Sequence, residues 1–221
     1  MFNIFRVAGD LLHLFSFFVL LLKIHSTKSC RGVSLKTQIL YSIVFITRYL
    51  DLAWNFSSLY NYIFKILFIT LSLSIVYVMK YEKPYCRTYE PLHDDFNILF
   101  LIVPCLGLAC FINEFFSITE VLWTFSIYLE AVAILPQLIV IHRTAKETGG
   151  FVDALNSHYV FALGGYRALY LLNWIYRLLT EPGYTNWIVW IAGLVQTAIY
   201  CDFFYYYLKA QVEGKAMALP I

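Results

Sequence analysis

The sequence predicts an all-α integral membrane protein with seven transmembrane helices. Its 221 residues are 61% hydrophobic and only 14% charged, and the mean hydropathy of +0.68 exceeds that of an ordinary soluble domain. A spanning helix needs about 20 mostly apolar residues. The windows of this kind are about 4–24, 36–55, 60–80, 96–114, 118–142, 158–179 and 186–208. Because little chain lies outside them, we expect residues 1–221 to form a single membrane domain.

Basic residues occur in alternate connections between these windows. The connections with Lys or Arg are 23–36, 80–87, 143–146 and the tail 209–221, and those without are 56–59, 115–117 and 182–185. The positive-inside rule therefore predicts a lumenal N-terminus and a cytosolic C-terminus. An odd number of spanning helices requires the same arrangement.

The two halves of the chain resemble each other. KIHSTK is similar to VIHRTAK, and RYLDL to RALYL, at nearly equal offsets. This similarity predicts a 3+1+3 arrangement, in which helices 1–3 (about 4–80) and helices 5–7 (about 118–208) are joined by a linking helix 4 (about 96–114). Such repeats place ligand sites near their interface. Chance similarity between apolar helices is the alternative.

The sequence contains no recognisable motif for a cofactor, metal or nucleic acid. Its five cysteines lack metal-ligand spacing, and those in connections are predicted to face the reducing cytosol. It has no Gly-rich phosphate loop, no basic nucleic-acid patch and no catalytic serine elbow. We therefore predict no cofactor, no metal, no disulfide, no nucleic-acid partner and no enzymatic activity.

Ionisable side chains lie inside the predicted membrane windows. A charge at the bilayer centre costs about 2.5–3.5 kcal/mol, so these residues should face the bundle interior or a water-filled cavity. Arg6, Asp10 and His13 have the spacing of one helix face. The other such positions, with the polar and aromatic residues beside them, are Arg48, Asp51, Asn55, Glu120, Trp123, Glu130, Tyr166, Arg167, Tyr170, Asn173, Trp174 and Arg177.

The predicted topology places arginines at several depths in a cavity open to the lumen. Arg6 and Arg177 would lie near its mouth, with Arg48 in the lumenal half and Arg167 near the middle. His13 would lie about 10 Å below Arg6 at 1.5 Å per residue. Because guanidinium groups bind carboxylates bidentately, this arrangement favours a ligand with several carboxylates.

Structural roles are the alternative for some of these charges. Arg48 with Asp51, and Arg167 with Glu130, would then be buried ion pairs that fix helix register. The residues near helix ends whose side chains would instead extend to the membrane interface are Arg6, Lys65 and Arg177.

Long runs of the sequence resemble the KDEL receptor family, the ER lumen protein-retaining receptors. The runs are NIFRVAGDLLH, TRYLDL, VLWTFSIYLEAVAILPQL, HYVFALGGYRALYLLNWIYR and YCDFFYYY. The resemblance implies a SWEET-like fold and a receptor in the Golgi and endoplasmic reticulum membranes. Such receptors bind C-terminal Lys/His-Asp-Glu-Leu signals of ER-resident proteins in the acidic Golgi. They return with coatomer (COPI) on the cytosolic side and release cargo near neutral pH.

The resemblance also implies roles for individual residues. Arg48 with Tyr49 corresponds to the anchor of the ligand's terminal carboxylate, Arg6 to the partner of its Glu, and Arg177 to the partner of its Asp. The remaining ligand-binding positions are Asp51, Glu120, Trp123, Tyr170, Asn173 and Trp174, of which Glu120 and Trp174 would receive the basic residue. The positions matching the pH switch are the proton-sensing His13 and the hydrogen-bonded set Glu130, Tyr166 and Arg167.

Residues at the other end of the bundle match the transport machinery of the family. Asp202 corresponds to a position needed for retrograde transport, and Lys209 belongs to the tail that would contact coatomer. This tail has only two lysines, fewer than is typical of the family. The connection 146–156 is also longer than usual.

A transporter of small solutes, of the SWEET or PQ-loop kind, is the main alternative function. The repeat and the motif LPQL favour it. The cavity arginines argue against it, because a neutral sugar site would favour Asn and Trp over several cations.

Overall fold

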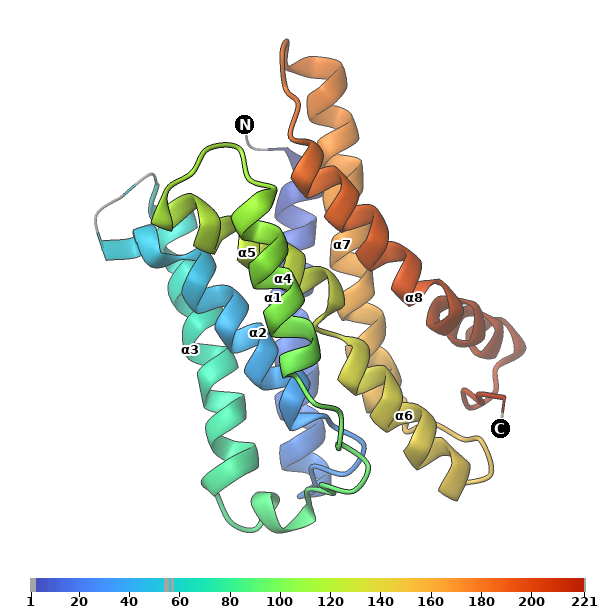
Figure 1. Cartoon of the computed structure of the whole chain (residues 1–221). Coiled ribbons are helices and arrows are strands. Elements are labelled where there is room, and N and C mark those ends of the chain that lie inside the picture. The colour runs from blue at the N-terminus through green and yellow to red at the C-terminus, as the bar shows by residue number, and fades with distance from the viewer. Residues whose placement is uncertain (1–2, 54–55, 57, 221) are drawn as a thin grey trace.

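The computed structural model describes residues 3–53, 56 and 58–220, and these residues form helices joined by loops (Figure 1). Asn55 lies outside the described residues. The α-helices are α1 (Ile4–Thr27), α2 (Leu35–Arg48), α3 (Leu59–Tyr81), α4 (Leu99–Phe111), α5 (Ile118–Val132), α6 (Leu135–Glu147), α7 (Ala154–Thr180) and α8 (Trp187–Glu213). Two short 3₁₀ helices, η1 (Leu50–Ala53) and η2 (Tyr85–Thr88), follow α2 and α3.

Helices lie in every predicted membrane window. The stretches long and apolar enough to cross a membrane are Ile4–Thr27, Leu59–Tyr81, Ile118–Glu147 and Trp187–Glu213. The other windows hold α2 with 14 residues, α4 with 13 residues and α7, whose 27 residues include buried polar groups. The structure is therefore an all-helical protein with helices of the membrane-spanning type.

Two windows differ in detail from the prediction of one continuous helix. The window 118–142 is divided between α5 and α6, because Pro136, in the first turn of α6, has no N–H to donate to the preceding turn. The window 36–55 contains an α-helix that ends at Arg48. Asp51 therefore lies in η1, beyond the face of α2 that carries Arg48.

Most helices begin at a side chain that accepts a hydrogen bond from the backbone of the first turn, which satisfies one of the otherwise unpaired N–H groups. The capping residues of this kind are Asn3, Ser34, Ser58, Ser117, Asp153 and Asn186. At the other end of α8, Gly214 has a left-handed conformation with φ of 62°, which glycine adopts without steric cost.

The helices pack so that α1 and α7 lie side by side at the centre (Figure 1). α2 lies between α3 and α5, α4 covers α5, and α8 packs on α7 and α5. Gly9 permits the close approach of α1 and α7, because a Cβ atom there would lie 2.9 Å from a ring carbon of Tyr170. The neighbouring Asp10 is thereby brought within reach of the Tyr170 hydroxyl.

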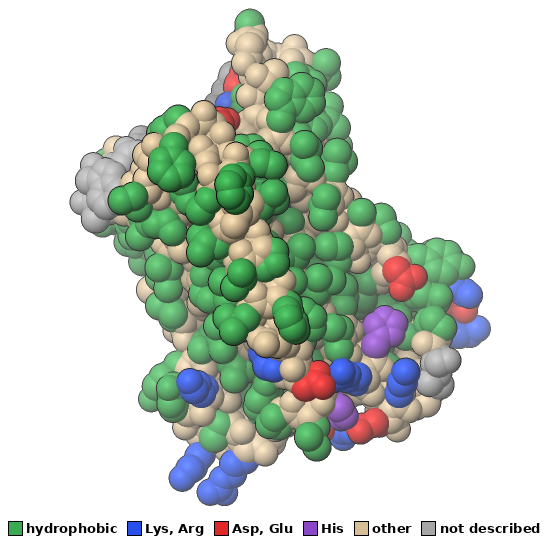
Figure 2. Space-filling view, viewed as in Figure 1, with side chains coloured by type: hydrophobic (Ala, Val, Ile, Leu, Met, Phe, Trp, Pro, Cys, Tyr) green, Lys and Arg blue, Asp and Glu red, His purple; other side chains and the backbone are tan. Residues whose placement is uncertain are grey.

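The surface supports a membrane setting. Figure 2 shows hydrophobic side chains over the middle of the molecule and most of the visible Lys and Arg side chains toward its lower end. Many large apolar side chains are exposed, and two examples on α1 are Leu11 and Phe18, each 53% exposed. A continuous exposed apolar surface of this kind marks contact with lipid or with another protein.

The C-terminal tail folds back onto the connection between α6 and α7. The amide of Val152 donates to the carbonyl of Met217 at 3.0 Å, and the amide of Leu219 donates to Gly150 at 2.9 Å. Met217 and Leu219 are each only 5% exposed. The 146–156 connection therefore provides the surface that holds the end of the chain.

Candidate ligand-binding cavity

A polar cavity of about 390 Å³ lies among the central helices. The predicted site residues that line it are Arg6, His13, Arg48, Tyr49, Trp123, Glu130, Tyr166, Arg167, Tyr170, Asn173, Trp174 and Arg177. The two others assigned to the site, Asp51 and Glu120, line a second pocket that shares Arg48, Tyr49 and Trp123 with the first. The fold thus gathers side chains that are up to 171 residues apart in sequence, from Arg6 to Arg177.

The carboxylate of Glu130, which is 1% exposed, is among the most buried polar groups of this cavity. Arg48 Nη1 lies 2.7 Å from Glu130 Oε2, and Arg167 Nη2 forms an ion pair with the same oxygen. The Tyr166 hydroxyl donates to Glu130 Oε1 at 2.6 Å. Arg48 also donates from Nε to Ser126 Oγ at 3.0 Å. One carboxylate therefore balances two guanidinium groups, and this cluster keeps a net positive charge.

The sequence suggested two buried ion pairs as structural alternatives, Arg48 with Asp51 and Arg167 with Glu130. The pair between Arg167 and Glu130 is present. Asp51 accepts from Lys65 Nζ through both carboxylate oxygens at 2.7 Å. Lys65, which was expected to extend toward the membrane interface, is instead turned inward, and its side chain is 16% exposed.

His13 lies in an aromatic cage beside the Glu130 cluster. Its ring stacks on that of Tyr166, with centroids 3.8 Å apart and planes 2° from parallel, and the Phe68 ring centroid is 4.8 Å away. His13 is 5% exposed, and within the described part of the chain its Nε2 has no hydrogen-bond partner. Tyr166, itself one of the four predicted switch residues, connects two of the others, because its ring contacts His13 while its hydroxyl donates to Glu130.

A second polar group surrounds Asp10 near the N-terminal end of α1. The hydroxyls of Tyr60 and Tyr170 both donate to Asp10, that of Tyr60 at 2.9 Å. Arg6 Nε lies 4.0 Å from Asp10, and Arg6 Nη2 donates to Asn61 Oδ1 at 2.8 Å. Tyr60 and Asn61 could not be identified from the sequence, because both are uncharged and are placed here only by the packing of α3.

At the end of α7, Arg177 contacts a carboxylate and an aromatic ring. Its Nε and Nη2 lie 2.9 Å and 2.8 Å from Glu181 Oε2. The Arg177 Cζ atom lies 3.8 Å from the ring centroid of Tyr184. Glu181 and Tyr184 were also missed, although the i, i+4 spacing of Arg177 and Glu181 is a signal for such a pair.

The two residues assigned to transport lie apart from this cavity. Asp202 and Lys209 are both on α8, and both are exposed. Neither lines the cavity that holds the arginines.

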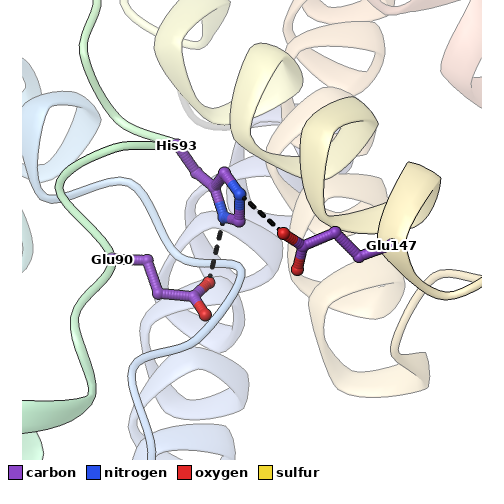
Figure 3. Close-up of side chains that lie close together, drawn as sticks. All are labelled: Glu90, His93 and Glu147. Carbon is purple, nitrogen blue, oxygen red and sulfur yellow. Dashed lines mark hydrogen bonds and ion pairs between the residues drawn. The ribbon is translucent and has the colours of Figure 1, made fainter.

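A cluster of possible metal ligands lies outside the cavity, formed by Glu90, His93 and Glu147 (Figure 3). His93 Nδ1 is 3.2 Å from Glu90 Oε2, and Nε2 is 3.1 Å from Glu147 Oε1. Both carboxylates also pair with Arg31, at 3.1 Å and 2.7 Å. The guanidinium of Arg31 would repel a metal cation at this position. We therefore interpret the cluster as an ion-pair network that joins three connections.

Comparison with known proteins identifies the same family that the sequence motifs resemble. Residues 29–177 match the model of the family described as ER lumen protein retaining receptor. The chain is 56% identical to an ER lumen protein-retaining receptor of Petunia hybrida, over 99% of both chains. It is 54% identical to the ER lumen protein-retaining receptor of Drosophila melanogaster and 50% identical to ER lumen protein-retaining receptor 2 of Bos taurus, again over 99% of each chain.

Proposed function

Because the chain belongs to the ER lumen protein retaining receptor family, we propose that it is a pH-dependent receptor for C-terminal Lys-Asp-Glu-Leu and His-Asp-Glu-Leu signals. It binds these signals of ER-resident proteins in the Golgi and returns them to the endoplasmic reticulum. The observation that carries the proposal is that Arg6, Arg48 and Arg177, from three helices, line one cavity. Such a constellation suits a peptide with three carboxylates.

The ligand enters with its C-terminus toward the Glu130 cluster. Arg48 and Tyr49 receive the terminal carboxylate, Arg6 the Glu side chain and Arg177 the Asp side chain. The net positive charge of the cluster around Glu130 favours a carboxylate at this depth. Glu120 and Trp174 receive the basic residue. The other contacts come from Asp51, Trp123, Tyr170 and Asn173.

Protonation of His13 couples binding to pH. Histidine is the side chain whose unperturbed pKa, near 6.5, lies between the pH values of the secretory pathway. A proton on His13 adds a cation beside Tyr166 and Glu130, which favours rearrangement of these residues with Arg167. If the bound receptor holds one more proton than the free receptor, affinity rises by up to about tenfold for each unit by which the pH falls. The signal is then bound at acidic pH and released near neutrality.

The chain forms a single membrane domain over residues 1–221, with seven transmembrane helices in a SWEET-like 3+1+3 repeat. Helices in all seven predicted windows support this arrangement, as does the gathering of basic side chains at one end of the molecule (Figure 2). The N-terminus is lumenal and the C-terminus cytosolic, in the membranes of the Golgi and endoplasmic reticulum. Lipid contacts the exposed apolar surface.

Retrieval requires contact with coatomer (COPI) at the cytosolic end, where α8 carries Asp202 and Lys209. The protein acts as a receptor, and we assign it no enzymatic activity and no cofactor. The family assignment and the three cavity arginines disfavour the alternative of a small-solute transporter.

Peptide binding to the purified receptor in detergent tests the proposal. A peptide ending in Lys-Asp-Glu-Leu should bind in mildly acidic buffer, and the same peptide with an amidated C-terminus should lose most of its affinity. The amide removes the negative charge that Arg48 would bind and leaves the rest of the ligand unchanged. Equal affinity of the two peptides would contradict the anchor role of Arg48.

A further inference from the structure

The guanidinium of Arg177 is held by a residue that neither the sequence nor the family resemblance assigned to the site. Glu181 is four residues further on, directly after the end of α7. Both Nε and Nη2 of Arg177 contact the same Glu181 oxygen, at 2.9 Å and 2.8 Å. Tyr184 stacks against the guanidinium, at 3.8 Å from its ring centroid. Arg177 and Tyr184 line the cavity.

The Nε and Nη2 edge of a guanidinium is one of the edges that bind a carboxylate bidentately. A ligand carboxylate that approached Arg177 along this edge would have to take the place of Glu181. The pair is open to exchange, because the side chains of Arg177 and Glu181 are 28% and 23% exposed. By contrast, the pair of Arg48 and Glu130 is buried, with side chains 15% and 2% exposed.

We infer that Glu181 is an internal competitor of the ligand for Arg177, an inference that rests on the proposed function. Its carboxylate occupies the guanidinium edge until the ligand's Asp side chain replaces it. Tyr184 holds the guanidinium plane during this exchange, since its ring contact does not use the hydrogen-bonding edge. Glu181 thereby lowers the affinity of the receptor and makes release easier, and it is a positioning residue for Arg177.

The charge state of Glu181 allows this competition in acidic solution. The hydrogen bond from Arg177 lowers the pKa of the Glu181 carboxyl below its ordinary value. Glu181 therefore remains ionised at a pH at which an isolated glutamate would begin to be protonated.

The substitution Glu181→Gln tests the inference through the dissociation constants of two peptides in mildly acidic buffer. One peptide ends in Lys-Asp-Glu-Leu, and the other ends in Lys-Asn-Glu-Leu and lacks the carboxylate assigned to Arg177. An exposed ion pair changes an equilibrium by up to about fivefold. Glu181→Gln should therefore tighten binding of the first peptide by about twofold to fivefold and leave binding of the second unchanged.

The matched control is Glu114→Gln, which removes the same charge from the exposed connection between α4 and α5. This control should bind both peptides with wild-type affinity. Unchanged or weaker binding of Lys-Asp-Glu-Leu by Glu181→Gln would overturn the inference and leave the proposed function standing. An equal gain in affinity for both peptides would also overturn it, since the lost negative charge of Glu181 would then act on the whole peptide and not through the Asp carboxylate assigned to Arg177. If the wild type bound neither peptide, the proposed function would fail and the inference with it.

Discussion

Replacing Glu130 by Gln should destabilise the receptor strongly. The variant keeps the size of the side chain and an oxygen that can accept from Tyr166, but it removes the charge shared by Arg48 and Arg167. Both arginines contact Glu130 Oε2, Arg48 at 2.7 Å, and their side chains are only 15% and 7% exposed. Removing one partner of a buried ion pair costs about 3–5 kcal/mol. For a chain of this size, each kcal/mol lowers Tm by about 2–4 °C, so a decrease of about 6–20 °C is expected.

Thermal unfolding in a single detergent, followed by intrinsic tryptophan fluorescence, measures this decrease. Glu114→Gln is the control, because it removes the same charge from an exposed position and should leave Tm nearly unchanged. If the Tm of Glu130→Gln lay within about 2 °C of the Tm of this control, the negative charge of Glu130 would not be needed to keep the two guanidinium groups buried. The interpretation of Glu130 as the centre of the cluster would then be wrong.

Three further substitutions test separate parts of the proposal. Arg48→Lys should weaken binding of a Lys-Asp-Glu-Leu peptide by tenfold or more, about 1.4 kcal/mol, because an ammonium cannot replace the guanidinium fork; wild-type affinity in a titration would contradict the anchor role. His13→Ala should lose tight acidic binding and flatten the pH profile of affinity, and an unchanged profile would place the proton sensor elsewhere. Asp202→Asn should keep peptide affinity while impairing return to the endoplasmic reticulum in cells, and equal losses of both would place Asp202 in the binding site or the fold.

The helices and the main cavity residues could be predicted from the sequence because their signals are local. Apolar runs of about 20 residues mark helices in lipid, and ionisable residues inside them must face an interior. The spacing of Arg6 and Asp10 correctly placed them on one face of α1, where they lie within 4.0 Å of each other.

Details that depend on turns and on packing could not be predicted in this way. The fifth window divides where Pro136 has no N–H to donate to the preceding turn, whereas Pro104 lies inside α4 without dividing it. Asp51 is in a 3₁₀ turn beyond α2 and pairs with Lys65 of α3. The contacts of Tyr60 with Asp10 and of Tyr184 with Arg177 depend on how separate segments approach each other. No spacing within one segment encodes such contacts.

The most direct test of the central claim is the affinity of the wild-type receptor for a His-Asp-Glu-Leu peptide, measured by titration in mildly acidic buffer and again near neutral pH. Recognition by the arginine cavity, coupled to protonation of His13, predicts saturable binding that is tighter in the acidic buffer, by up to about tenfold per pH unit. It also predicts that the amidated peptide binds weakly at both pH values. Equal affinity at the two pH values, or tighter binding near neutrality, would contradict a receptor that loads in the Golgi and unloads in the endoplasmic reticulum.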